Sequence, residues 1–210
     1  MQDLIIIGAA TPTIIRVIED INENQVSKFR ILGFVDSDPA KHGREFYGIP
    51  VIGNFESCLN FDKQKIQVIN TIAGSIKARE QTTQWFLEKE FQFTNIVHPS
   101  VNLKHCKIGT GNLVYENATI HPYVTIGNHC VVSSNSGIAH ESVLHDYCFI
   151  GPASYICGKV IIEDRVFIGV GAHILPRLKL KSHCTVAAGA LVTKSIDADK
   201  RVCGIPAREF

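Results

Sequence analysis

The chain has 210 residues, 45% of them hydrophobic and 20% charged, which is the balance of an ordinary globular protein with one or two domains. Lys and Arg number 21 against 20 Asp and Glu, a net charge of +1, so no basic field points to nucleic acid or to a membrane surface. No apolar run has the length of a membrane span, and the residues after Met1 do not form a signal peptide. We therefore expect a cytoplasmic protein.

The first predicted unit is a strand, a turn and a helix. Residues 3–7 form an apolar run that is typical of a buried strand and that ends at Gly8. Thr11 is a suitable N-cap and Pro12 a suitable first helical residue, so we expect an amphipathic helix that reaches about Asn22.

A second predicted strand, residues 31–35, ends in Asp36 and Ser37. A strand, a turn, a helix and a strand followed by an acid form the first unit of a Rossmann-like fold, where the helix N-terminus holds a phosphate and the acid binds a ribose hydroxyl. The GxGxxG signature is absent, and Gly8 is the only glycine in the turn. A small α/β domain without a nucleotide therefore stays open as the alternative.

Further along, residues 65–73 are predicted to form a strand that ends at Gly74, and Ser75 to cap a helix that reaches about Glu90. Residues 91–97 are predicted to form the last strand of the domain. Ligands bind at the carboxyl ends of parallel strands in an open α/β sheet. The candidate substrate-binding positions are those that follow such strands: Gly8, Asp36, Ser37 and Gly74.

A six-residue repeat begins soon after the segment His98-Pro99-Ser100. Every sixth residue is Ile, Val or Leu at fifteen consecutive positions: Ile108, Val114, Ile120, Ile126, Val132, Ile138, Leu144, Ile150, Ile156, Ile162, Ile168, Ile174, Leu180, Val186 and Val192. The residues two positions before them are mostly small and lie on the same side of a strand. A six-residue unit suits one flat wall of a three-walled prism, so 18 residues make one coil of a hexapeptide β-helix.

The repeat predicts about five coils and a domain boundary near residue 98. We expect an α/β Rossmann-like domain over residues 1–97 and an all-β parallel β-helix over residues 98–210. The tail after Val192 loses the period. We expect it to leave the prism and cover the open end, where strand edges would otherwise be exposed.

The seven cysteines include no CxxC pair. Four of them occupy the small inward position of the repeat: Cys106, Cys130, Cys148 and Cys184. We interpret them as small apolar side chains in a reducing compartment, rather than as disulfides or zinc ligands.

Residues 18 apart in this repeat are neighbours about 4.8 Å apart along the prism axis. One such column follows the third wall: Pro122, His140, Gly158, Pro176 and Lys194. His140 is therefore next to Gly158, whose missing side chain leaves room for a ligand beside the imidazole, and Glu141 follows it directly. An imidazole can take a proton from an incoming amine or hydroxyl, and a carboxylate fixes its tautomer.

A second column follows the second wall: Glu116, Ser134, Pro152, Val170 and Ala188. Its upper members are small or apolar. An exposed backbone edge beside them can pair with an extended, amide-containing ligand such as a pantetheine arm. Simple packing is the alternative interpretation of this column.

The two-domain order, with the segments GIAHESVLHDYCFIGPASYICGKVIIEDRVFIGVGAHILP and AAGALVTKSIDADKRVCGIPAREF, resembles the sugar O- and N-acetyltransferases of the sialic-acid and bacillosamine type. The resemblance covers essentially the whole chain. It implies a left-handed β-helix, acetyl-CoA as cosubstrate without a metal, and a homotrimer with active sites between subunits. Members related to the bacillosamine enzyme acylate the 4-amino group of nucleotide-linked 4-amino-4,6-dideoxy sugars.

The resemblance also implies roles for single residues. It makes His140 the general base and Glu141 the acid that supports it. It puts Gly158, Val170 and Ala188 along the acetyl-CoA tunnel.

Gly8, Asp36 and Gly74 match the turns that hold the nucleotide-sugar in this family. Two positions depart from the family pattern. The first turn reads GAATPT where the family has a Gly-rich, GAGGH-type sequence. His145 stands where the family has glycine. We interpret it as a corner residue, with an additional ligand-facing group as the alternative.

We therefore expect an acetyl-CoA-dependent N-acetyltransferase that acts on such a nucleotide-sugar by direct attack, with His140 as the general base. Three alternatives stay open. A sugar or polysaccharide O-acetyltransferase of the sialic-acid type would use the same chemistry. A zinc hydrase of the γ-carbonic-anhydrase kind would need three converging histidines, for which the candidates are His121, His140 and His145. A non-catalytic scaffold would use the prism alone.

Overall fold

A computed structural model describes residues 1–10, 12–24 and 28–210. The chain divides into two compact units, Met1–Ile96 and Val97–Phe210. The division lies next to the His98-Pro99-Ser100 segment. Among the described residues, no helix has the length and apolar character needed to cross a membrane.

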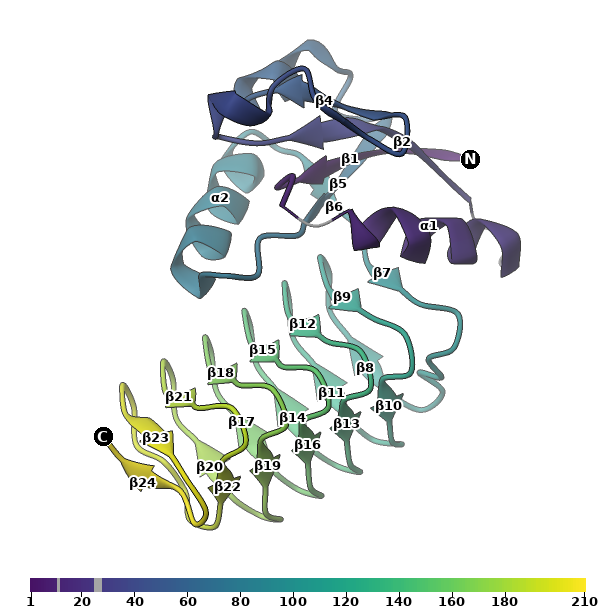
Figure 1. The fold of residues 1–210 in the computed structure, drawn as a ribbon. Coiled ribbons are helices and arrows are strands. Elements are labelled where there is room, and N and C mark those ends of the chain that lie inside the picture. Colours follow the sequence, from purple (N-terminus) through teal and green to yellow (C-terminus); the bar gives the residue numbers. More distant parts are fainter. Residues whose placement is uncertain (11, 25–27) are drawn as a thin grey trace. The chain divides into compact units, whose positions relative to one another are not determined.

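The first unit is built around a six-stranded sheet in the order β3-β4-β2-β1-β5-β6 (Figure 1). Its strands are β1 (Gln2–Ile7), β2 (Phe29–Val35), β3 (Glu45–Phe46), β4 (Ile49–Gly53), β5 (Ile66–Asn70) and β6 (Gln92–Phe93). Neighbouring strands pair in parallel, except that β3 runs antiparallel to β4. This sheet bears out the predicted α/β fold of the N-terminal domain.

In the described part of this unit, the helices between these strands are α1 (Thr13–Asn24), the 3-10 helices η1 (Pro39–Lys41) and η2 (Phe55–Asn60), and α2 (Ile76–Glu88). Residues 4–7 of β1 have no exposed surface, as expected of a parallel strand that is covered on both faces. Phe86 of α2 packs with Ile5 and Val68 in the core of one face.

The predicted ends of helices and strands in the first unit are partly confirmed. Ser75 caps α2 as predicted, because its side chain accepts a hydrogen bond of 3.2 Å from the N–H of Ala78. The strand predicted for residues 65–73 ends at Asn70, whose Oδ1 accepts a 2.9 Å hydrogen bond from the N–H of Ile72 and turns the chain. The cap predicted at Thr11 lies outside the described residues.

The prediction of one last strand over residues 91–97 is wrong. The segment contains two short strands in different sheets: β6 pairs with β5, whereas β7 (Ile96–Val97) joins β9 (Leu113–Val114) in a wall of the prism. An apolar run predicts that a strand forms, but it carries no information about which sheet supplies the hydrogen-bond partner.

The second unit is a prism with three walls (Figure 1). The first wall contains β8 (Lys107–Ile108), β11 (Thr125–Ile126), β14 (Val143–Leu144), β17 (Ile161–Ile162) and β20 (Lys179–Leu180). The second contains β7, β9, β12 (Val131–Val132), β15 (Phe149–Ile150), β18 (Phe167–Ile168), β21 (Thr185–Val186), β23 (Arg201–Cys203) and β24 (Arg208–Glu209). The third contains β10 (Thr119–Ile120), β13 (Gly137–Ile138), β16 (Tyr155–Ile156), β19 (His173–Ile174) and β22 (Leu191–Val192).

The register within each wall follows the repeat. Thr125 pairs with Val143, and Gly137 pairs with Tyr155, in parallel. The Ile, Val and Leu residues at every sixth position, from Ile108 to Val192, are the aliphatic ladder. They form the core of the prism, and most of them have almost no exposed surface. A β-helix preceded by an α/β domain is therefore the fold, as the repeat predicts.

The corners of the prism carry residues with a left-handed backbone. Positive φ values recur at every sixth residue from His105 to Gly189. Most of these residues are not glycine: Glu141 has φ 60° and Lys159 has φ 62°. Such values are uncommon outside glycine, so the coil geometry, rather than local preference, holds these residues in place.

The inward cysteines do more than fill space. Cys130 Sγ donates to the backbone oxygen of His145 at 3.0 Å, and Cys148 Sγ donates to that of Glu163 at 3.0 Å. Each bond runs from one coil to the next and satisfies a carbonyl near a corner. All seven cysteines are free thiols.

The expectation that the tail leaves the prism is wrong. β23 adds one more parallel strand to the second wall beside β21, and β24 then turns back antiparallel to β23. Ile196 also forms a parallel bridge with Leu180 of the first wall. Without the tail, the edge of β21 would have unpaired N–H and C=O groups, and β23 satisfies them by continuing the wall. Ala207 of the tail packs against the prism core.

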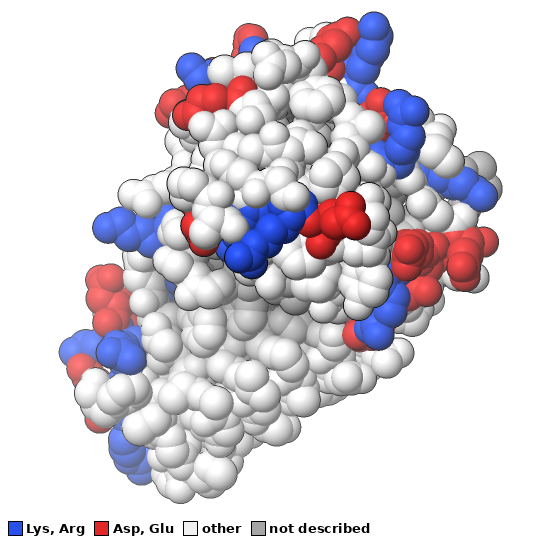
Figure 2. Space-filling view, turned by 45° about the horizontal axis from the view of Figure 1, so that its top comes forward, with Lys and Arg blue, Asp and Glu red and all other residues white. Residues whose placement is uncertain are grey.

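Charges on the surface are mixed in sign. On the face drawn in Figure 2, Lys and Arg side chains lie beside Asp and Glu side chains, and no broad region of that face carries one sign alone. This distribution agrees with the net charge of +1.

Candidate functional site

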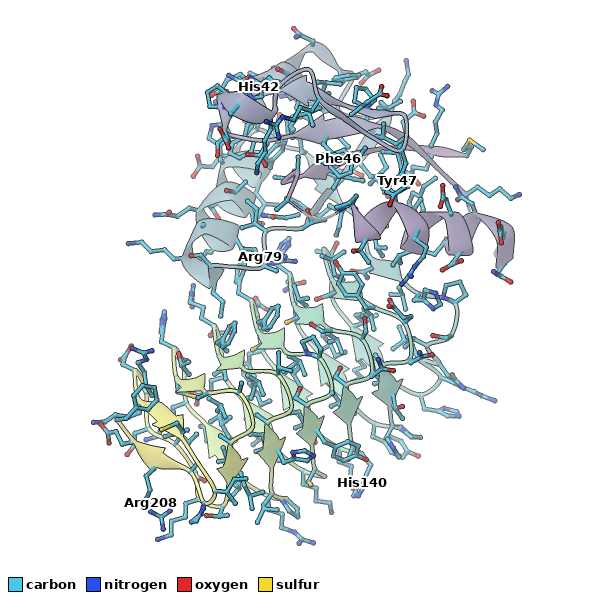
Figure 3. The ribbon with its side chains drawn as sticks, in the orientation of Figure 1. His42, Phe46, Tyr47, Arg79, His140 and Arg208 are labelled. Atoms are coloured by element: carbon cyan, nitrogen blue, oxygen red, sulfur yellow. The ribbon has the colours of Figure 1, made fainter. Side chains whose placement is uncertain are left out.

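His140 lies at the corner between the third and first walls. It follows β13 and precedes β14, and its side chain points away from the prism core (Figure 3). Its neighbours Ala139 and Ser142 are buried, so the backbone on both sides is anchored. The side chain itself is 56% exposed. A rigid corner thus presents an accessible imidazole.

Glu141 binds the imidazole directly. Its Oε2 lies 2.9 Å from His140 Nδ1. Because an ionised carboxylate only accepts hydrogen bonds, this contact places a proton on Nδ1 and leaves Nε2 of the neutral ring as an acceptor. The contact with His140, together with Lys159, lowers the pKa of the Glu141 carboxyl below its ordinary value. The pair therefore has the geometry of a general base and its orienting acid.

Gly158 lies against the imidazole, as the 18-residue arithmetic predicts. A Cβ atom added to Gly158 would lie 2.7 Å from Nε2 and 2.9 Å from Cε1 of His140. Such distances are well below van der Waals contact, so no other residue fits here while the ring keeps its place. His140, Glu141 and Gly158 therefore form one cluster in two adjacent coils.

Ser142 connects these two coils. It is fully buried. Its Oγ donates to the backbone oxygen of Cys157 at 3.0 Å and accepts a 3.2 Å hydrogen bond from the N–H of Val160. These bonds flank Gly158 and hold its backbone at a constant distance from the corner of His140.

Replacing Ser142 with Ala is expected to lower the free energy of unfolding by about 1–3 kcal/mol, because it leaves a buried N–H and a partly buried carbonyl without their partner. Urea unfolding of the purified protein measures the change. Ser142→Cys keeps a donor of the type that Cys130 supplies, and we expect it to recover part of the loss. Equal stability of the Ala and Cys variants would show that the hydrogen bonds are not the cause.

Val170 and Ala188 lie together at the corner between the second and third walls. The N–H of Gly189 donates to the backbone oxygen of Val170 at 2.8 Å, and the side chain of Val170 is largely exposed. The coils approach closely here, since a Cβ at Gly169 would lie 2.5 Å from the N atom of Ala188. Within one chain, this corner is a different one from that of His140.

Asp146, shortly after Glu141 in the sequence, has a structural role. Its Oδ1 accepts a 2.7 Å hydrogen bond from the N–H of Asn128, and its own N–H donates to Asp164 Oδ1 at 3.0 Å. These contacts join three coils at the remaining corner. His145 is exposed at the same corner, and its backbone oxygen accepts from Cys130 Sγ.

In the first unit, Gly8 and Asp36 come together. Gly8 has φ 92°, and the N–H of the following Ala9 donates to Asp36 Oδ2 at 2.7 Å. The other oxygen, Oδ1, accepts from the N–H of Asp38 at 2.9 Å. Burial raises the pKa of Asp36, but hydrogen bonds from Lys41, Asp38 and Ala9 outweigh it, and the net shift is downward. Asp36 therefore holds the turn itself as an ionised, nearly buried carboxylate.

Two residues near this turn were missed by the sequence argument. Lys41 Nζ lies 2.8 Å from Asp36 Oδ2, and His42 Nε2 lies 2.8 Å from the backbone oxygen of Asp36. Lys41 is the last residue of η1 and His42 is its C-cap, and this helix begins at Pro39 and folds back on the end of β2. The Asp38-Pro39 pair is a turn signal that could have indicated this return. Ser37 and Gly74 are exposed, and no atom crowds Gly74.

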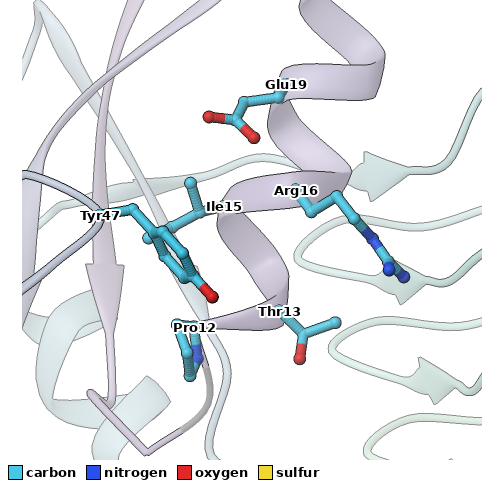
Figure 4. Close-up of a pocket in the computed structure, with 6 residues that line it drawn as sticks. All are labelled: Pro12, Thr13, Ile15, Arg16, Glu19 and Tyr47. Carbon is cyan, nitrogen blue, oxygen red and sulfur yellow. The ribbon is translucent and has the colours of Figure 1, made fainter.

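A cavity of about 340 Å³ opens beside the start of α1 (Figure 4). It is lined by Pro12, Thr13, Ile15, Arg16, Glu19 and Tyr47. Tyr47 is 83% exposed and has φ 50°, so a flat aromatic face and a cationic side chain border the same space.

The zinc alternative needs a cluster of ligands. Among the described residues of one chain, no group of three or more His, Cys, Asp or Glu side chains could hold a metal ion.

Comparisons with known proteins agree with this architecture. Residues 105–140 match the family model described as bacterial transferase hexapeptide (six repeats). No curated protein matches the chain.

Solved structures share the fold over the whole chain. One is a histidine-to-asparagine mutant of perosamine N-acetyltransferase from Caulobacter crescentus in complex with CoA and GDP-perosamine: it is 24% identical, with coverage of 100% of this chain and 97% of that chain and a TM-score of 0.89. PerB from the same organism, also with CoA and GDP-perosamine, is 25% identical, with coverage of 100% of this chain and 98% of that chain and a TM-score of 0.87. The acetyltransferase domain of PglB from Neisseria gonorrhoeae, in complex with acetyl coenzyme A, is 23% identical, with coverage of 100% of this chain and 99% of that chain and a TM-score of 0.88. The predicted resemblance to hexapeptide sugar acetyltransferases is thus confirmed at the level of fold.

Proposed function

We propose that this chain is an acetyl-CoA-dependent N-acetyltransferase that acts on the 4-amino group of a nucleotide-linked 4-amino-4,6-dideoxy sugar. The observation that carries the proposal is the cluster of His140, Glu141 and Gly158: an accessible imidazole with a carboxylate on Nδ1 and a glycine beside Nε2. Fold similarity to structures that contain CoA or acetyl-CoA supports the choice of cosubstrate.

The reaction needs two proton transfers, one from the sugar amine to His140 and one from His140 to the departing thiol. The sugar amine attacks the thioester carbonyl carbon while His140 Nε2 takes the amine proton. Glu141 stabilises the imidazolium that forms, because its carboxylate stays on Nδ1. Backbone N–H groups are suited to stabilise the oxyanion. The tetrahedral intermediate then collapses, the C–S bond breaks, and CoA leaves as a thiol with the proton from His140.

Direct attack is preferred over an acetyl-enzyme because the thiols are poor nucleophiles here. Cys157, the cysteine beside Gly158, has its pKa raised by burial. Burial also raises the pKa of Cys184 to about 12. Only the thiolate attacks a thioester at a useful rate, so at neutral pH these side chains stay protonated and inert. Detection of an acetylated cysteine during turnover would contradict this route.

We assign Val170 and Ala188 to acetyl-CoA binding together with Gly158. Because Val170 and Ala188 occupy a different corner from His140, a thioester bound along them meets His140 most simply between two copies of the prism. The proposal therefore includes a homotrimer of left-handed, five-coil prisms. Light scattering measures the mass in solution, and a monomer at assay concentrations contradicts this arrangement.

We assign the nucleotide part of the substrate to the first unit, with Gly8, Asp36, Ser37 and Gly74 as binding positions. Asp36 belongs to this set through the turn that it shapes, because both of its oxygens accept hydrogen bonds from the protein. The cavity beside Tyr47 offers an aromatic face on which a nucleobase can stack.

The test is an acetyl-transfer assay with a panel of acceptors, in which the released CoA thiol is measured. With acetyl-CoA in excess, we expect turnover with a nucleotide-linked 4-amino-4,6-dideoxy sugar. We expect kcat/KM to be about a hundredfold lower with the analogue that has a 4-hydroxyl group. Free sugars lack the nucleotide and are expected to react slowly. Preference for a hydroxyl acceptor would instead establish the O-acetyltransferase alternative.

A further inference from the structure

Lys159 occupies the corner position directly above Glu141. It lies between β16 and β17, 18 residues after Glu141, and its N–H donates to the backbone oxygen of His140 at 3.0 Å. Glu141 and Lys159 share the left-handed backbone conformation, with φ values of 60° and 62°. Equivalent backbone geometry in adjacent coils directs the two side chains along the same edge of the prism.

The two side chains meet at one carboxylate. Lys159 Nζ lies 3.4 Å from Glu141 Oε1, whereas His140 Nδ1 lies 2.9 Å from Oε2. The lysine and the imidazole therefore bind opposite oxygens of Glu141 and do not compete for one acceptor. The Lys159 backbone also adjoins Gly158, which is in contact with the other side of the same ring.

We propose that Lys159 is a positioning residue for the acetyl transfer proposed above: it holds the Glu141 carboxylate against His140 Nδ1. This inference rests on the proposed function. An exposed glutamate without a second partner has several rotamers, and only some of them reach the imidazole. A cation on the far oxygen favours the rotamer in which the near oxygen faces Nδ1.

Two groups act on the pKa of Glu141: the imidazole of His140 on its own corner and the ammonium of Lys159 from the coil above. Both lower its pKa. Removing the ammonium raises the pKa of Glu141, so the carboxylate is lost at a higher pH as the solution is acidified. Glu141 is still ionised at neutral pH without the ammonium, so the loss of Lys159 changes the position of the carboxylate and not its charge.

The chain offers a matched control one coil further along. Arg177 is the next residue of this column, with φ 62° and an N–H that donates to the backbone oxygen of Gly158 at 3.1 Å. It is an exposed cation with the same backbone conformation as Lys159. Changing it tests whether any positive charge on this edge has the same effect.

The experiment compares Lys159→Gln, Lys159→Arg and Arg177→Gln. For Lys159→Gln we expect kcat to fall about two- to fivefold, the range of an exposed ion pair, with the KM for the sugar substrate unchanged. Lys159→Arg should restore kcat, and Arg177→Gln should change neither kcat nor KM. A higher KM with unchanged kcat would show that Lys159 contacts the substrate instead, and would overturn the proposal.

A second readout does not depend on turnover. Side-chain 15N NMR of His140 reports whether Nδ1 or Nε2 carries the proton. We expect the Nδ1–H form to dominate in the neutral ring of the parent protein and to lose population in Lys159→Gln. If no sugar is acetylated but this tautomer shift occurs, the proposed function fails and the positioning by Lys159 stands. If the sugar is acetylated and the tautomer population is the same in both proteins, the positioning role is wrong.

Discussion

Replacing His140 with Ala is expected to lower kcat/KM for acetyl transfer by about 10²–10⁴-fold, the usual contribution of a positioned general base. Without the imidazole, the amine must lose its proton to water after or during attack. Glu141 cannot replace it, because a glutamate carboxylate is a much weaker base than an imidazole. Steady-state kinetics with saturating acetyl-CoA measure the loss.

The effect must come from chemistry and not from unfolding. His140 is more than half exposed and its side chain contributes little to the core, so thermal unfolding of His140→Ala should match the parent protein. His145→Ala is the matched control, since His145 is an exposed histidine at the next corner. Full activity in His140→Ala would remove the base from the proposal. Loss of activity in both variants, together with bound zinc in the parent protein, would support the hydrase alternative.

Replacing Gly158 with Ala is expected to have the second-largest effect, a fall in kcat/KM of about tenfold to a thousandfold. The added Cβ would lie 2.7 Å from Nε2 of His140, so the ring must leave the position in which Glu141 orients it. Displacement of a catalytic group by about 1 Å can cost 10²-fold in rate. Gly158 is not in the left-handed region, so the backbone accepts alanine without strain.

A double-mutant cycle separates the two roles of Gly158. If the Cβ acts only through His140, Gly158→Ala should have no further effect in a His140→Ala background. An additional loss in that background means that the Cβ also blocks the ligand. Normal activity of Gly158→Ala alone, with a stable fold, would mean that the imidazole does not need its observed position.

The repeat made one part of the site predictable. Because the backbone returns to the same place every 18 residues, the contact between His140 and Gly158 follows from counting, and the structure shows that contact. The pairing of His140 with Glu141 was also predictable, since the two are adjacent and the corner leaves both side chains exposed. Counting also places Lys159 above Glu141, but it does not say which way a long, flexible side chain turns.

In the first unit, sequence patterns do not predict the contacts around Asp36. Asp36 follows a strand as a ribose-binding acid would, but in the fold its oxygens accept hydrogen bonds from Ala9 and Asp38. Lys41 and His42 reach it from the end and the C-cap of η1, a short segment with no hydrophobic period. Their contacts depend on the path of a loop, and a loop path is decided by packing against distant segments.

The sequence by itself determined the three-walled prism, the α/β domain before it, the buried ladder and the corner that carries His140. It could do so because each repeat imposes one local rule, and identical rules in register add up to a single global structure. Only the tertiary structure decided the sheet to which residues 96–97 belong, the return of the tail into the second wall, the internal role of Asp36 and the contact of Lys159 with Glu141. Each of these depends on the choice of a hydrogen-bond or ion-pair partner far along the chain, and hydrophobic periodicity carries no information about that choice.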